Sequence, residues 1–359
     1  MKILRACWFL VWFFTLAVSS VGLNAAAAKD AHGLRVTDYF ISHTSNEPFY
    51  AEHKLDPGVT LHVREVVLAG RERTVAQDGK VMLLVHGWSI PGSAAFDTDH
   101  ENCSLMRHFA RAGWDTFALD LEGFGLSTRP PVMDSPAAFP DSKAPIRADV
   151  TMRDMERVVD FISALRGVEQ VHLLGWSTGA GREAPLYAIR HPEKVARLVL
   201  FGASYRNSMT REEREKSAAK SEAKKVLHSV PALDRWAKLG TEKEFVVPGC
   251  FEANRDALLA SDPMSGELGG VIRVPAGRTI DEDLADPYFD ATKISVPTLV
   301  IRGEADTWAK REDNQRLLDA LGSTVKEYVE IPGGGHFLHF EKVNTQFYEA
   351  LQNFLEAEQ

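Results

Sequence analysis

Short runs of consecutive apolar residues, separated by stretches of helical periodicity, constrain the fold of this chain most strongly. The clearest is Val81–Val85, and similar runs occupy 114–121, 171–174, 195–201 and 297–301. A strand that is apolar at every position is covered on both faces, which is typical of a parallel sheet. Residues 36–41 and 59–68 alternate instead and predict half-buried strands, and 325–331 predicts a final strand.

Helical patterns lie between these runs. Within 149–167 the apolar residues recur at helical spacing, and Gly167 follows as a stop signal. Strands that alternate with helices predict an α/β fold: a mostly parallel central sheet with helices on both faces.

The N-terminal 28 residues predict a secretory signal peptide. Lys2 and Arg5 precede an apolar run over 6–18, and small residues lead to Ala28, after which we expect cleavage. The alternative is an uncleaved membrane anchor, but the apolar run is short for a span. We therefore expect a secreted or periplasmic protein with no stable membrane span once the signal is removed.

Charge and composition exclude nucleic acid as a partner. The chain of 359 residues has 41 basic and 50 acidic residues, a net charge of −9, and removing the signal peptide makes it more acidic. It contains no basic tail or block of the kind that binds phosphate backbones.

One segment interrupts the alternation of strand and helix. Residues 205–290 lack strong strand patterns and begin with a charge-rich helical stretch, 211–225, whereas the later part has apolar residues to bury. We expect a mostly helical cap here, inserted between core residues 29–204 and 291–359.

Gly175-Trp176-Ser177-Thr178-Gly179 directly follows one apolar run and precedes a helical pattern. G-x-S-x-G in this strand–turn–helix context marks a nucleophilic serine on a sharp turn. The residues two positions before and after the serine must be very small, because larger side chains would collide at so sharp a turn. The pattern predicts Ser177 as a nucleophile.

A serine hydroxyl needs a base and an orienting acid, and in α/β folds both follow later strands. The strand at 297–301 leads to Asp306, with Glu304 as a rival for the acid. The final strand leads through a glycine-rich loop to His336, the predicted base. His339 is more typical of a packed histidine.

His86-Gly87-Trp88 ends another predicted core strand. In this position it predicts an oxyanion loop, with the backbone N–H groups of Trp88 and Thr178 directed at developing negative charge. Trp88, Trp176 and Trp308 are also candidates for an apolar substrate pocket, with core packing as the alternative for each.

No cofactor or metal signature occurs in the sequence. Phosphate-binding and dinucleotide fingerprints are absent, and Cys103 and Cys250 have no metal-ligand spacing. We expect no cofactor and no metal. The residues 97–101 resemble a solvated acidic turn rather than a cation loop. A Cys103–Cys250 disulfide, joining the core to the cap, is a hypothesis, since both cysteines also suit a buried apolar role.

The chain resembles the α/β-hydrolase superfamily over nearly all its length beyond the signal. The resemblance rests on 86–88, 175–179, 303–306, 335–336 and the D-x-x-G-x-G-x-S segment 120–127. It implies a Ser177–His336–Asp306 triad and a cap between the sixth and seventh sheet strands.

These features predict an exported serine hydrolase that cleaves a small-molecule carboxylic ester or lactone through an acyl-enzyme. Acyl transfer, perhydrolysis or carbon–carbon bond hydrolysis at the same site is an alternative. A binding protein on a hydrolase scaffold is a weaker one, because all three triad residues are retained. The sequence leaves the acyl and alcohol groups and the oligomeric state open.

Overall fold

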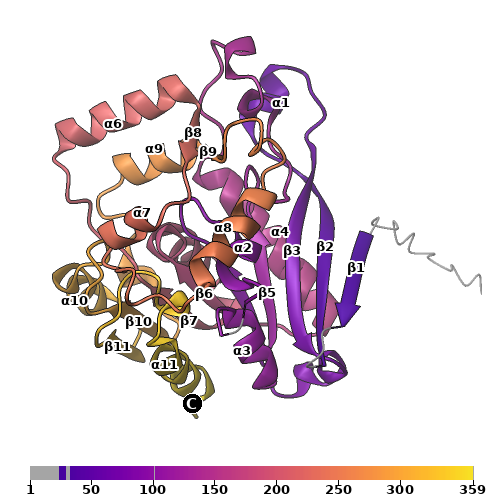
Figure 1. The fold of residues 1–359 in the computed structure, drawn as a ribbon, viewed down its shortest axis with the longest axis vertical. Helices are drawn as coiled ribbons and strands as arrows, with labels where there is room; N and C mark the ends of the chain where they lie inside the picture. The colour runs from indigo at the N-terminus through magenta and orange to yellow at the C-terminus, as the bar shows by residue number, and fades with distance from the viewer. Residues whose placement is uncertain (1–23, 30–32, 101, 359) are drawn as a thin grey trace, which may run out of the picture.

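The computed structural model describes residues 24–29, 33–100 and 102–358. Within them, one sheet has nine strands in the order β1-β2-β3-β5-β4-β6-β7-β10-β11 (Figure 1). Their bounds are β1 (Asn24–Lys29), β2 (Leu34–Thr44), β3 (Gly58–Leu68), β4 (Val81–Val85), β5 (Asp115–Asp120), β6 (Val171–Trp176), β7 (Val195–Phe201), β10 (Thr298–Gly303) and β11 (Lys326–Ile331). β1, β2, β3 and β5 pair antiparallel, and the pairs from β5 to β11 are parallel. The predicted mostly parallel sheet is confirmed.

The centre of the sheet is apolar on both faces, as the uninterrupted apolar runs predict. Every residue of β4 and β6 is buried, and Leu83 lies between Phe117 and Leu173 in the neighbouring strands. The helices that cover the core are α2 (Gly92–Phe96), α3 (Leu105–Arg111), α4 (Ala148–Arg166), α5 (Ala184–Arg190), α10 (Arg311–Ala320) and α11 (Asn344–Glu356). The short α1 (Pro48–Glu52) packs in a separate small apolar cluster. α4 ends where predicted, because Gly167 adopts the left-handed conformation at its C-terminus.

The cap lies between β7 and β10, which are the sixth and seventh strands of the sheet when counted from β2. It contains α6 (Arg211–Lys224), α7 (Leu233–Lys238), α8 (Cys250–Ala260) and α9 (Ala276–Leu284). It also contains a short antiparallel pair, β8 (Val226–Ser229) with β9 (Ile272–Pro275), which the sequence analysis did not predict. In Figure 1 the cap elements lie together above one end of the sheet strands.

A disulfide joins the cap to the core. Cys103, just before α3, is bonded to Cys250 at the start of α8, with their Cα atoms 5.8 Å apart. Nearby, the Asn254 side chain donates to the Ala94 carbonyl at 2.7 Å. The hypothesis that these two cysteines pair is confirmed.

The acidic segment before Cys103 matches its prediction as a solvated turn only in part, since Asp99 and His100 are exposed but Asp97 is not. Asp97 is 3% exposed. Its carboxylate accepts from the Ser104 hydroxyl at 2.9 Å and from Arg107 Nε at 2.8 Å. These partners, which the sequence spacing does not reveal, offset the cost of burying the charge. Glu101 lies outside the described residues.

Most of the predicted signal peptide, residues 1–23, lies outside the described residues. Residues 24–28 form most of β1, an edge strand paired to β2, so cleavage after Ala28 would remove nearly all of this strand. Among the described helices, none is both long and apolar enough to cross a bilayer.

The three predicted triad residues and the predicted oxyanion loop follow parallel strands. The loop 86–88 follows β4, Ser177 follows β6, Asp306 follows β10 and His336 follows β11. Because the carboxyl ends of parallel strands meet at one edge of the sheet, the topology alone brings these residues to the same edge, beneath the cap.

Candidate active site

Ser177 occupies the sharp turn between β6 and the helical turn η5 (Gly179–Glu183). Its φ is +58°, a left-handed conformation that is costly for a residue with a side chain. A Cβ on Gly175 would lie 2.5 Å from the Gly179 carbonyl oxygen, and a Cβ on Gly179 would lie 2.5 Å from that of Val85. Both glycines are therefore required by close backbone approach, as the motif predicts.

Ser177, His336 and Asp306 form a continuous chain of hydrogen bonds. Ser177 Oγ lies 2.9 Å from His336 Nε2, and His336 Nδ1 lies 2.8 Å from Asp306 Oδ2. His336 and Asp306 are 1% and 4% exposed, whereas Ser177 is half-buried and borders a cleft. In this geometry the imidazole can take the serine proton while the carboxylate holds the ring.

The two candidate acids occupy different places. Asp306 Oδ1 accepts hydrogen bonds from the backbone N–H groups of Trp308 at 2.8 Å and Ala309 at 2.9 Å, so its carboxylate is fixed toward His336. Glu304 is exposed, and its side chain accepts instead from the Gly333 N–H at 3.0 Å. Only Asp306 contacts the imidazole.

The surroundings of His336 set its position. The indole N–H of Trp176 donates to the His336 carbonyl at 3.1 Å. Gly202 leaves space for the ring, because a Cβ there would lie 3.2 Å from His336 Cε1. His339 is fully buried against Trp176, Phe201 and Phe340, and burial lowers its pKa to about 3, so it is a packed neutral ring as predicted.

The loop predicted to form an oxyanion hole runs beside the nucleophile. A Cβ on Gly87 would lie 3.0 Å from Ser177 Cβ, so the loop passes close to Ser177 at the residue before Trp88. Thr178 precedes η5, at a helix start where backbone N–H groups have no intrahelical acceptor. Both residues therefore border the space in front of the serine hydroxyl.

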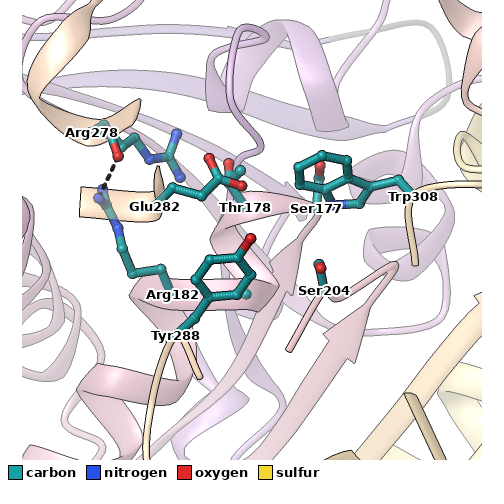
Figure 2. Close-up of a pocket in the computed structure, with 9 residues that line it drawn as sticks. Ser177, Thr178, Arg182, Ser204, Arg278, Glu282, Tyr288 and Trp308 are labelled. Atoms are coloured by element: carbon teal, nitrogen blue, oxygen red, sulfur yellow. Dashed lines mark hydrogen bonds between the residues drawn. The ribbon is translucent and has the colours of Figure 1, made fainter. Parts of the chain in front are cut away.

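The three candidate pocket tryptophans differ in exposure. Trp176 is 2% exposed and packs in the core behind His336, although it also forms part of a cavity wall. Trp308 is 36% exposed and lies next to Ser177 in Figure 2. Trp88 is half-buried at the junction of two cavities that both reach Ser177.

A buried cluster of charged residues, absent from the sequence predictions, links the cap to the nucleophile turn. Arg278 of α9 donates to the carbonyls of Gly87 at 2.7 Å and His86 at 3.0 Å and forms an ion pair with Glu183 at 2.7 Å. Arg182 donates to the Arg278 carbonyl at 2.8 Å (Figure 2). Burial raises the pKa of Glu183, but the two guanidinium groups outweigh burial and lower it to about 2.

Glu282, also of α9, reaches the cleft beside Ser177. In Figure 2 its carboxylate lies near Thr178, with Tyr288 and Ser204 on the opposite wall. Burial raises its pKa to about 7, although the positive charges of Arg182 and Arg278 act in the opposite direction. No sequence motif marks these cap residues; only the fold shows that α9 lies against the nucleophile turn. In the described parts of the chain, no cluster of three potential metal ligands occurs.

Comparison with known proteins shows the family to which this chain belongs. A family model described as serine aminopeptidase, S33 (Hydrolase_4), matches residues 91–343. The chain belongs to this family of α/β hydrolases. The curated relatives of this hydrolase include a 2-hydroxy-6-oxononadienedioate/2-hydroxy-6-oxononatrienedioate hydrolase of Klebsiella pneumoniae, 26% identical over 288 residues, covering 77% of this chain and 88% of the relative.

Solved structures show the same fold at low sequence identity. A thermophilic esterase from Thermogutta terrifontis superposes with a TM-score of 0.57 at 17% identity, covering 88% of this hydrolase and 97% of the esterase. The enol-lactonase from Burkholderia xenovorans gives a TM-score of 0.55 at 17% identity, covering 83% of this hydrolase and 97% of the lactonase.

Proposed function

We propose that this α/β hydrolase is an exported enzyme that cleaves a carboxylic ester or lactone through an acyl-enzyme on Ser177. The observation that carries the proposal is the unbroken hydrogen-bond chain from Ser177 through His336 to Asp306. Ser177 and His336 both line a cleft, and Ser177 is the more exposed of the two.

Each step of the reaction has a residue to perform it. Ser177 Oγ attacks the carbonyl carbon while His336 Nε2 accepts its proton, and Asp306 stabilises the imidazolium that forms. The Trp88 and Thr178 N–H groups donate to the tetrahedral oxyanion. His336 then protonates the leaving alcohol, and a water that it deprotonates hydrolyses the acyl-enzyme and restores the serine.

Carbon–carbon bond hydrolysis is the second candidate, supported by the relative from Klebsiella pneumoniae. The compound in the name of that relative is an oxo diacid without an ester bond, so its hydrolysis breaks a carbon–carbon bond. The same serine and histidine suit attack on such a ketone.

Two features support export. The first 28 residues have the pattern of a signal peptide, and disulfides such as Cys103–Cys250 persist in oxidising compartments. N-terminal sequencing of protein from the periplasm or medium should begin at Lys29, whereas cytoplasmic protein beginning at Met1 would contradict export.

The reaction is tested with p-nitrophenyl esters of short acids and, in parallel, a 2-hydroxy-6-oxo dienoate. We expect a burst of p-nitrophenol equal to the enzyme concentration, abolished by Ser177→Ala, and ester turnover that exceeds that of the dienoate. Ser177→Ala typically removes most of the rate, about 10⁴-fold or more. Undiminished ester turnover by that variant, or turnover of the dienoate alone, would contradict ester hydrolysis.

A further inference from the structure

Beside the nucleophile lies a small apolar cavity whose lining includes one permanently charged side chain. Its volume is about 70 Å³, and it reaches both Ser177 and His336. Side chains such as Ile90, Trp236 and Phe251 form its walls. Among the described residues that line it, Arg235 of α7 is the only lysine, arginine, aspartate or glutamate.

The Arg235 guanidinium is held in place by neutral groups. Its central carbon lies 4.7 Å from the centre of the Trp88 ring, and one terminal nitrogen donates to the Ser229 hydroxyl. Trp88 is itself fixed, because its indole N–H donates to the Thr279 hydroxyl at 2.7 Å. The guanidinium is therefore oriented before any ligand arrives.

No carboxylate of the described residues forms an ion pair with Arg235. The other two arginines next to the nucleophile turn, Arg182 and Arg278, are both paired with Glu183. Burial lowers the pKa of Arg235, and no neighbouring carboxylate opposes this effect. A half-buried charge without a counter-ion is costly, and the contact with the Trp88 ring offsets part of that cost.

We propose that Arg235 binds a carboxylate group of the substrate, so that the preferred substrates are esters or lactones with a free carboxylate in the part that enters the apolar cavity. This rests on the proposed function of Ser177. A guanidinium presents parallel N–H donors that match the two oxygens of a carboxylate. Arg235 acts here as a specificity-determining residue rather than a catalytic one.

The test compares anionic and neutral esters of matched size. One pair is the p-nitrophenyl monoester of glutaric acid with p-nitrophenyl valerate, which places the carboxylate on the acyl side. The other is 4-valeryloxybenzoate with 4-valeryloxybenzamide, which places it on the leaving group. The enzymes are the wild type, Arg235→Gln, Arg235→Lys and Lys243→Gln, an exposed cap lysine whose loss changes net charge equally.

In at least one pair, we expect Arg235→Gln to lower the ratio of anionic to neutral kcat/KM about 10- to 100-fold, the loss typical of one hydrogen-bonded charge pair. Arg235→Lys should recover part of that ratio, and Lys243→Gln should leave it unchanged. The neutral esters report folding and chemistry in every variant. If Arg235→Gln leaves the ratio of anionic to neutral kcat/KM unchanged in both pairs, while Ser177 is still required to cleave the neutral esters, the role of Arg235 is overturned and the proposed function stands. Neutral esters cleaved equally by Ser177→Ala would instead contradict the proposed function.

Discussion

Glu282 has its pKa raised to about 7 by burial, from a usual 4.5, in the cleft beside Ser177. Between these two values the folded protein holds a proton that the unfolded chain releases. The free energy of unfolding therefore falls as pH rises from about 4.5 to about 7. Above about pH 7 the stabilisation that protonated Glu282 provides is lost.

Replacing Glu282 with Gln should remove that pH dependence. We expect Glu282→Gln to lose less stability than the wild type between pH 5 and pH 8, because the amide cannot ionise in the cleft. Urea unfolding at the two pH values measures the difference. Glu244→Gln, at an exposed position, should follow the wild type; the same pH dependence in Glu282→Gln as in the wild type would contradict the account.

At the scale of elements, α9 connects the cap to the nucleophile turn through Arg278. This side chain is fully buried and satisfies the carbonyls of His86 and Gly87 as well as Glu183. Arg278 thus ties the loop at 86–88, η5 and the cap into one unit.

Arg278→Met should therefore destabilise the protein strongly. It leaves a buried carboxylate with one partner fewer and removes one donor from each of two carbonyl groups, and breaking a buried pair costs about 3–5 kcal/mol. Urea unfolding measures the loss. Arg211→Met, at an exposed position of α6, should leave the unfolding curve unchanged, and an equally unchanged curve for Arg278→Met would show that the cluster is not structural.

The sequence predicts those elements that a pattern within one short segment of the chain identifies. The buried strands are continuous apolar runs, and the glycines around Ser177 are dictated by backbone contact, so both could be located in advance. β8 and β9 could not, because each has four residues and they are more than forty residues apart. The sequence also did not mark three charged cap residues, Arg235, Arg278 and Glu282. In a sequence, a charged residue of the cap is typical of the solvent-exposed surface, and only the fold shows that these three lie near Ser177.

At the scale of the whole molecule, the Cys103–Cys250 disulfide holds the cap over the carboxyl edge of the sheet. It closes a loop of 147 residues, and crosslinks that close long loops restrict the unfolded chain most. The position of the cap over the site therefore depends in part on an oxidising environment.

Removing this crosslink by Cys103→Ser with Cys250→Ser should lower the free energy of unfolding by roughly 2–5 kcal/mol. Denaturant unfolding of the double variant measures the change, and addition of a reductant should affect the wild type but not the variant. Equal stability of the two proteins under oxidising conditions would contradict a structural role for the disulfide.

We infer that the His336–Asp306 pair makes Ser177 nucleophilic. Mass spectrometry after treatment with a fluorophosphonate tests it most directly. We expect one adduct per chain, located on Ser177. It should form far more slowly in His336→Ala and be absent in Ser177→Ala. A wild-type protein that stays unlabelled, or an adduct on another residue, would contradict it.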